Sequence, residues 1–159
     1  MAEAYICLGS NLGDKRATIA QALDRLARAA DIVVKARSGD YRTPPWGKLD
    51  QDWFVNACAC IETPLTPEAL LAQCLDVERQ LGRERRERWG PRVIDIDLLT
   101  YDDRAMATES LTLPHPHLTQ RAFVLVPLAE IAPTLEINGR SVADWLAALD
   151  FAGIERMAP

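Results

Sequence analysis

The sequence lacks the features that would place a protein in a membrane, outside the cell or on a nucleic acid. The N-terminal apolar run, Ala4 to Leu8, covers only five residues, too few for a bilayer-spanning helix or a secretory signal. The net charge is −5, whereas a nucleic-acid or anionic-membrane partner usually requires a broad basic surface. We therefore expect a cytoplasmic protein that binds neither nucleic acid nor membrane.

Histidine is scarce, and the few cysteines show no metal-binding pattern. The chain has two histidines and four cysteines, and Cys7, Cys58, Cys60 and Cys74 lie in apolar runs without a histidine nearby. This pattern favours buried reduced thiols over zinc ligands or disulfides. Repeats and low-complexity tracts are also missing, and 159 residues suit one domain with a substantial core. We expect a single domain over residues 1–159 that acts as a monomer.

Charge is concentrated in one short segment, Arg83 to Leu99, with the sequence RERRERWGPRVIDIDLL. Asp95 and Asp97 fall at alternate positions of an expected strand, so their carboxylates share one face with Cα atoms roughly 6.6–7 Å apart. Two such charges repel by roughly 2–3 kcal/mol at ~6.5 Å and an effective dielectric of ~20, which calls for a cation. Mg²⁺ fits, since it takes a few carboxylates together with phosphates and waters.

The five arginines of this segment would bind the phosphate oxygens that the metal leaves free. A more ordinary interpretation stays open from the residues alone. Asp-x-Asp is common on the solvated face of a strand, and Arg/Glu runs often form exposed helix ends with weak ion pairs.

The pattern of apolar residues predicts an α+β fold. Strands are expected over residues 4–8, 32–41, 54–63 and 93–101, and helices from about 14, over 67–81 and over 121–131. A short hairpin near residues 102–105 and a tail (135–149) with a short strand pair and a closing helix complete the chain. The order strand, helix, strand, strand, helix, strand is that of the ferredoxin-like βαββαβ sandwich with a mostly antiparallel sheet. We expect the helices on one face and the site on the other, open face.

The third expected strand carries a polar slot. Its alternation places Phe54, Asn56 and Cys58 on one face. With Thr43 and Trp46 from the preceding loop, Phe54 and Asn56 could form a flat slot for a planar, hydrogen-bonding ring.

Four motifs now occur together and in order: LGSN at Leu8, YRTPPWG at Tyr41, RWGPRVIDIDLL at Arg88 and LPHP at Leu113. Through them the chain resembles the 6-hydroxymethyl-7,8-dihydropterin pyrophosphokinases of folate biosynthesis, from Tyr5 to about Pro133. The resemblance implies transfer of the β,γ-diphosphoryl group of ATP to the hydroxymethyl group of a reduced pterin, with release of AMP and with two Mg²⁺ ions.

The resemblance also implies roles for individual residues. Asp95 and Asp97 would hold both metals, and Arg83 and Arg92 would be the catalytic arginines that clamp the phosphates. The ATP site would include Glu78, Arg85, Arg86, Arg88, Trp89, Leu98, Thr112, His115 and Arg121. The pterin would lie between Phe54 and Phe123, with its edge contacted by Thr43, Pro44, Trp46 and Asn56.

Three other functions use the same residues differently. A two-metal nucleotide phosphohydrolase would consume ATP without a pterin, and a nucleotide-binding module would bind ATP without turnover. An RNA-binding ferredoxin-like domain would explain the arginines but neither the acidic charge nor Asp95 and Asp97.

Overall fold

The computed structural model describes residues 1–29, 31–44, 52–82 and 93–159. No helix in these ranges is both long and apolar enough to cross a membrane. In chain order the elements are β1 (Ala2–Ser10), α1 (Lys15–Arg28), β2 (Val33–Arg37), β3 (Tyr41–Thr43), β4 (Phe54–Thr63), α2 (Pro67–Gln80), β5 (Asp95–Tyr101), β6 (Met106–Ala107), β7 (Thr112–Leu113), the 3-10 helix η1 (Leu118–Gln120), α3 (Ala122–Ile131), β8 (Glu136–Ile137), β9 (Arg140–Ser141), α4 (Val142–Ala147) and β10 (Glu155–Arg156).

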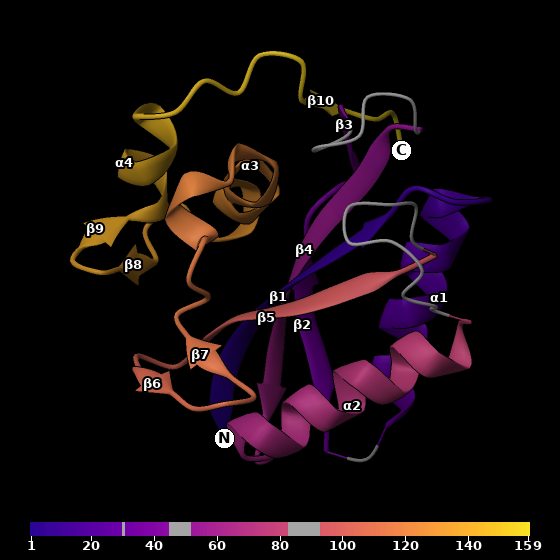
Figure 1. Ribbon diagram of the computed structural model, residues 1–159, viewed down its shortest axis with the longest axis vertical. Helices are drawn as coiled ribbons and strands as arrows, with labels where there is room; N and C mark the ends of the chain where they lie inside the picture. The colour runs from indigo at the N-terminus through magenta and orange to yellow at the C-terminus, as the bar shows by residue number, and fades with distance from the viewer. Residues whose placement is uncertain (30, 45–51, 83–92) are drawn as a thin grey trace.

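A six-stranded sheet forms the centre of the molecule (Figure 1). Its strand order is β10-β3-β4-β1-β5, β2 also pairs with β4, and every pairing is antiparallel. Since β2 and β3 occupy one edge of β4 in succession, they act together as the second strand of a βαββαβ motif. The predicted ferredoxin-like α+β fold is confirmed.

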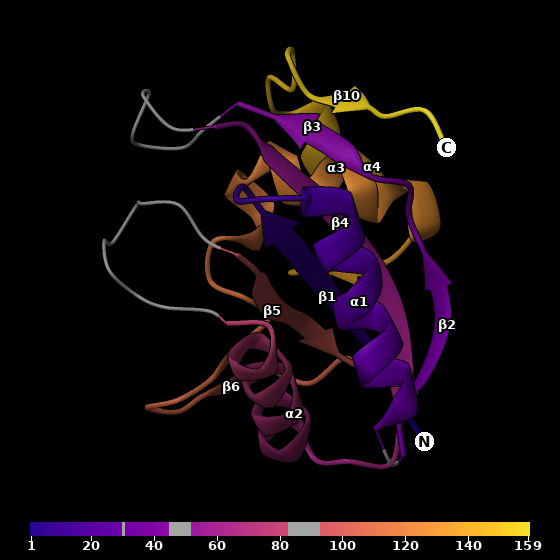
Figure 2. The same ribbon diagram turned by 90° about the vertical axis from the view of Figure 1, so that its right-hand side faces the viewer.

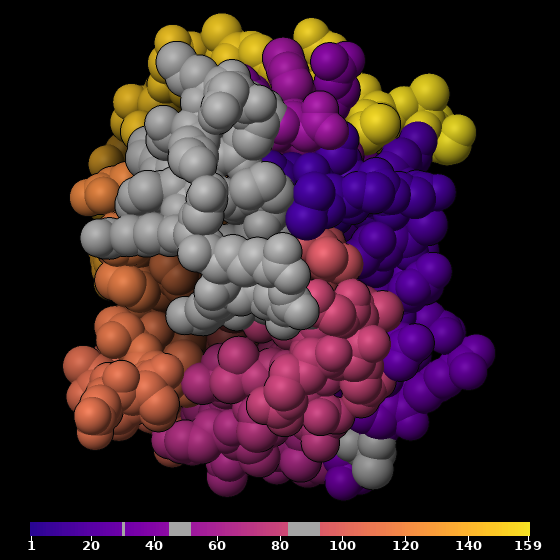
Figure 3. Space-filling model, turned by 45° about the vertical axis from the view of Figure 1, so that its right-hand side comes forward, coloured from indigo at the N-terminus to yellow at the C-terminus, as the bar shows by residue number. Residues whose placement is uncertain are grey.

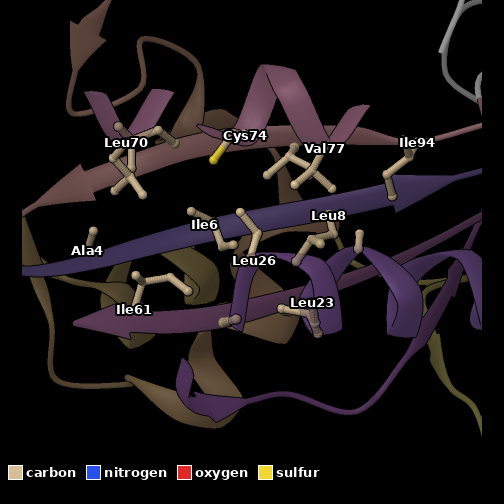
Figure 4. Close-up of a cluster of buried hydrophobic side chains, with 14 of the residues drawn as sticks. Ala4, Ile6, Leu8, Leu23, Leu26, Ile61, Leu70, Cys74, Val77 and Ile94 are labelled. Atoms are coloured by element: carbon tan, nitrogen blue, oxygen red, sulfur yellow. The ribbon is translucent and has the colours of Figure 1, made fainter. Parts of the chain in front are cut away.

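Helices α1 and α2 lie on the same face of the sheet (Figure 2). Each begins where the sequence predicts, because the side chains of Asp14 and Thr66 accept hydrogen bonds from the backbone N–H groups of Ala17 and Ala69. The side chains that these helices project onto β1 and β4 make the main core (Figure 4), which includes Ile6, Leu8, Leu23, Leu26, Ile61, Leu70, Cys74 and Val77. All four cysteines are buried and free, as predicted.

The second face of the sheet is not fully open, and this part of the prediction is wrong. Helices α3 and α4 cover part of it (Figure 1) and form a second core with Cys7, Cys58 and Leu99 of the sheet. The reason lies in α3, whose sequence AFVLVPLAEI is apolar almost all round and therefore needs burial on more than one side. The site occupies what remains of this face.

Two further differences concern the sheet edge that carries β3. The single strand expected over residues 32–41 is split into β2 and β3, separated by Ser38, Gly39 and Asp40. A C-terminal strand, β10, then pairs with β3, although the sequence indicated no strand there. Two residues are too few for alternation to be recognised.

Candidate active site

One cavity of about 630 Å³ opens on the second face of the sheet, a size typical of small-molecule sites. Its walls come from β1, β3, β4, β5, α2, the β6–β7 segment and α3. Figure 3 shows the β6–β7 segment in orange beside α2 in magenta on one side of the molecule. Elements far apart in the sequence thus contribute to a single site.

The cavity brings together every predicted site residue that the structure describes: Thr43, Pro44, Phe54, Asn56, Glu78, Asp95, Asp97, Leu98, Thr112, His115, Arg121 and Phe123. The other predicted residues lie outside the described ranges: Trp46, Arg83, Arg85, Arg86, Arg88, Trp89 and Arg92.

The acidic pair stands on the edge strand β5. Asp95 and Asp97 are half-buried and line the cavity. Ile96 and Leu98 are buried in the main core, as the alternation predicts, and also reach the cavity wall. The buried carboxylate of Glu78 on α2 accepts a hydrogen bond of 2.7 Å from the backbone N–H of Ile96, the residue between the two aspartates. This bond fixes the backbone that carries both acidic side chains.

A divalent metal suits this pair of carboxylates. No cluster of three or more Asp, Glu, His or Cys side chains suited to a metal occurs within the described ranges. Asp95 and Asp97 therefore offer only part of the six oxygen ligands that Mg²⁺ prefers, and phosphate and water oxygens would complete them. Burial, followed by Glu78 and Asp97, raises the pKa of the nearby Cys74 thiol to about 12, so this thiol stays protonated near pH 7.

The polar slot lies on the neighbouring strands. Asn56 and Thr43 are both buried, and the side-chain amide of Asn56 donates a hydrogen bond of 3.0 Å to the hydroxyl of Thr43. Phe54 lies two residues before Asn56 on β4 and also lines the cavity. Phe123 lines the cavity from the first turn of α3. A planar ring that enters the slot would meet aromatic surface together with an amide and a hydroxyl.

Gly9 separates the slot from the acidic pair, and sequence reasoning missed it. It is the register partner of Asn56 on β4 and of Asp95 on β5. Two strand spacings, roughly 9–10 Å, therefore separate the amide from the acidic edge. A Cβ at Gly9 would lie 2.5 Å from Oδ1 of Asn56, so only glycine leaves room for the observed position of this amide.

The remaining walls combine apolar, uncharged polar and charged side chains, among them Glu109 and Arg121. Burial, followed by nearby Arg121 and His117, lowers the pKa of His115 to about 4. His115 is therefore neutral near pH 7 and offers a hydrogen-bonding ring without a charge. Sequence reasoning did not place the following residues in the site, although they also line the cavity: Cys7, Gly9, Leu71, Leu75, Ile96, Thr108, Glu109, Ser110, Leu111, Pro116 and His117. Leu71 and Leu75 follow the helical period of α2 and could not be told from core residues.

Replacing Gly9 by alanine should weaken binding of the ring in the slot more than binding at the acidic edge. The new methyl group displaces the Asn56 amide, at a cost of about 1–3 kcal/mol for a badly paired buried polar group. Titration calorimetry with a ligand of the slot and, separately, with a ligand of the acidic edge measures the two losses of affinity. The matched control is the same substitution in an Asn56→Ala background, where the clash is gone and the two effects should not add. Additive effects would contradict this role of Gly9.

Comparison with known proteins identifies similar chains. A family model described as 7,8-dihydro-6-hydroxymethylpterin-pyrophosphokinase (HPPK) matches residues 5–133. A protein of Methylorubrum extorquens named 2-amino-4-hydroxy-6-hydroxymethyldihydropteridine pyrophosphokinase is 58% identical over 157 residues, which is 99% of each chain. A protein of Pseudomonas aeruginosa with the same name is 42% identical and covers 96% of this chain and 95% of its own.

Solved structures agree on the fold. The crystal structure of Plasmodium falciparum HPPK-DHPS wild type with pteroate superposes with a TM-score of 0.74 over 92% of this chain at 14% identity. The present chain spans only 42% of that protein. This likeness therefore concerns the fold of the shared part.

Proposed function

The chain belongs to the 7,8-dihydro-6-hydroxymethylpterin-pyrophosphokinase family, and we propose that its cavity holds ATP and the pterin side by side. It is an ATP-dependent diphosphokinase of folate biosynthesis, which transfers diphosphate from ATP to the hydroxymethyl group of 6-hydroxymethyl-7,8-dihydropterin. The observation that carries the proposal is that one cavity contains both the Asn56 slot and the Asp95–Asp97 edge.

The slot on β3, β4 and α3 is the proposed pterin site. Phe54 and Phe123 would sandwich the ring, and Thr43, Asn56 and the backbone near Pro44 and Trp46 would contact its edge. The donors and acceptors of a pterin need polar partners, since a purely apolar slot would leave them unpaired. Its hydroxymethyl group would then point across Gly9 toward β5.

The acidic edge and the arginine segment form the proposed phosphate site. Asp95 and Asp97 would hold two Mg²⁺ ions, with Glu78 keeping their backbone in place. When bound, Mg²⁺ would neutralise phosphate charge and lower the pKa of a hydroxyl that contacts it, so that no strong base is needed. Arg83 and Arg92 would contact the phosphate oxygens. ATP would also meet Arg85, Arg86, Arg88, Trp89, Leu98, Thr112, His115 and Arg121.

We also propose that the enzyme acts as a monomer in the cytoplasm. Residues from distant parts of one chain, between Cys7 and Phe123, line the cavity together, which supports a site formed within one subunit. Free, buried thiols at all four cysteines agree with a reducing compartment.

Simultaneous binding of both substrates tests the proposal. The pterin is titrated into the enzyme, by its fluorescence, with and without saturating α,β-methylene-ATP and Mg²⁺. Separate subsites in one cavity predict that the nucleotide leaves the pterin affinity unchanged or increases it. Displacement of the pterin by the nucleotide would contradict this arrangement. In a separate incubation with ATP and Mg²⁺ but no pterin, rapid loss of ATP would instead indicate a phosphohydrolase.

A further inference from the structure

Glu130, near the C-terminal end of α3, joins three segments of the chain. Its two carboxylate oxygens each accept a hydrogen bond of 3.1 Å from the backbone N–H of Gly39. One of them also accepts from the hydroxyl of Tyr41 at 2.7 Å and from Nε of Arg156 at 3.2 Å. The carboxylate therefore connects α3 with β3 and with the C-terminal strand β10.

Helix formation alone does not favour a carboxylate at this position. The C-terminal end of a helix carries a partial negative charge, which repels Glu130. Burial would raise its pKa, but the bonds from Tyr41, Gly39 and Arg156 outweigh burial and lower the pKa below its ordinary value. Tertiary partners therefore keep the carboxylate ionised and in place.

Helix α3 and strand β3 each contribute a residue to the proposed pterin slot. Phe123 lies seven residues before Glu130, on the same face of α3 and roughly 10 Å along its axis. Thr43 lies two residues after Tyr41, on the same face of β3, and holds the Asn56 amide. Glu130 thus links the helix that carries Phe123 to the strand that carries Thr43.

Apolar packing between α3 and the sheet does not by itself fix the position of α3 relative to β3. Val124, Leu125 and Leu128 bury α3 against the second core, but hydrophobic contact is non-directional and tolerates small shifts along the strand. Hydrogen bonds have narrow preferences in distance and angle. The exposed pair with Arg156, whose side chain is 53% exposed, adds little stability.

We infer that Glu130 is a positioning residue for the pterin: by tying α3 to β3, it sets the distance between Phe123 and the Thr43–Asn56 pair. The inference rests on the proposed function, because it assigns this slot to the pterin. The arginine of β10 and the hydroxyl of Tyr41 support the same carboxylate. The C-terminal strand thereby helps to shape the slot, although it lies beyond the residues matched by the family model.

Steady-state kinetics and pterin binding of Glu130→Ala test this role. We expect the kcat/KM for the pterin to fall by about tenfold to a hundredfold, the loss that a misplaced substrate causes, with a higher pterin Kd and the KM for ATP little changed. Glu130→Gln should recover part of the loss, because its amide oxygen still accepts from Gly39 and Tyr41. Tyr41→Phe, which removes one hydroxyl, should show a smaller loss in the same direction.

The matched control is Glu62→Ala, which removes a carboxylate on β4 that pairs with Lys35 at 3.1 Å and does not line the cavity. It should leave the kcat/KM for the pterin and the KM for ATP unchanged. Glu130→Ala with wild-type pterin affinity, or with equal losses for ATP and pterin, would overturn the inference alone. A wild-type protein without pterin-dependent turnover would overturn the proposed function and the inference with it.

Discussion

Replacing Asp97 by alanine is expected to abolish magnesium-dependent turnover while leaving the fold intact. The side chain lines the cavity, and its strand neighbours Ile96 and Leu98 keep the main core in place. In the proposed metal site a lone Asp95 would offer Mg²⁺ one carboxylate fewer, where the described part of the chain contributes two, and the phosphates would lose the cation that neutralises them. AMP formation is measured as a function of Mg²⁺ concentration, and circular dichroism reports the fold.

The control for this experiment is Asp103→Ala. This substitution removes an exposed carboxylate from the turn that directly follows β5, the strand that carries Asp97. Asp103 does not line the cavity. Wild-type turnover is expected for this variant. If Asp97→Ala also kept its activity in Mg²⁺, the assignment of the metal to the Asp95–Asp97 edge would be wrong.

Replacing Arg92 by alanine should lower kcat by about 10²–10³, or ~3–4 kcal/mol, the usual loss for one preorganised donor to a developing charge. Arg92 lies outside the described residues, but only three positions separate it from Asp95, so their Cα atoms are at most roughly 11 Å apart. An arginine there can reach a phosphate held at the acidic edge. Rapid-quench measurement of the single-turnover rate isolates this effect from product release.

Arg92→Lys separates charge from geometry. Lysine keeps the positive charge but lacks the planar fork that binds two phosphate oxygens at once. We expect a rate between those of wild type and Arg92→Ala. A near-wild-type rate for Arg92→Ala would place this arginine outside the chemistry.

The elements that the sequence predicted well are those with strong local signals. β4 has the predicted bounds, Phe54–Thr63, because its run of mostly apolar residues is long and Pro64 follows it directly. α1 and α2 begin at the predicted caps, Asp14 and Thr66. The faces of Asp95 and Asp97 also followed from alternation alone.

What the sequence did not predict depends on contacts between distant segments. β10 exists because β3 offers it a free edge, and the second core forms because α3 folds back over β4. A register shift between β1 and β5 at Tyr5 and Ile6 likewise has no local signature. Gly9 belongs to the same class, since its importance lies in the side chain of Asn56 across the sheet.

The roles of single residues in the site came from two sources. Spacing alone indicated the acidic pair and an aromatic slot with an amide, without deciding between a solvated strand face and a metal site. The family motifs added ATP, the pterin and the surrounding contacts. The cavity joins those assignments in space wherever the chain is described, but the identity of each ligand contact stays a prediction.

Phosphorus NMR of the enzyme with Mg²⁺, ATP and 6-hydroxymethyl-7,8-dihydropterin tests the central claim most directly. If the cavity places the hydroxymethyl group against the β-phosphorus, AMP and a pterin diphosphate should accumulate in equal amounts, and neither should form without the pterin. Accumulation of ADP with a pterin monophosphate, or of free phosphate, would contradict diphosphoryl transfer at this site.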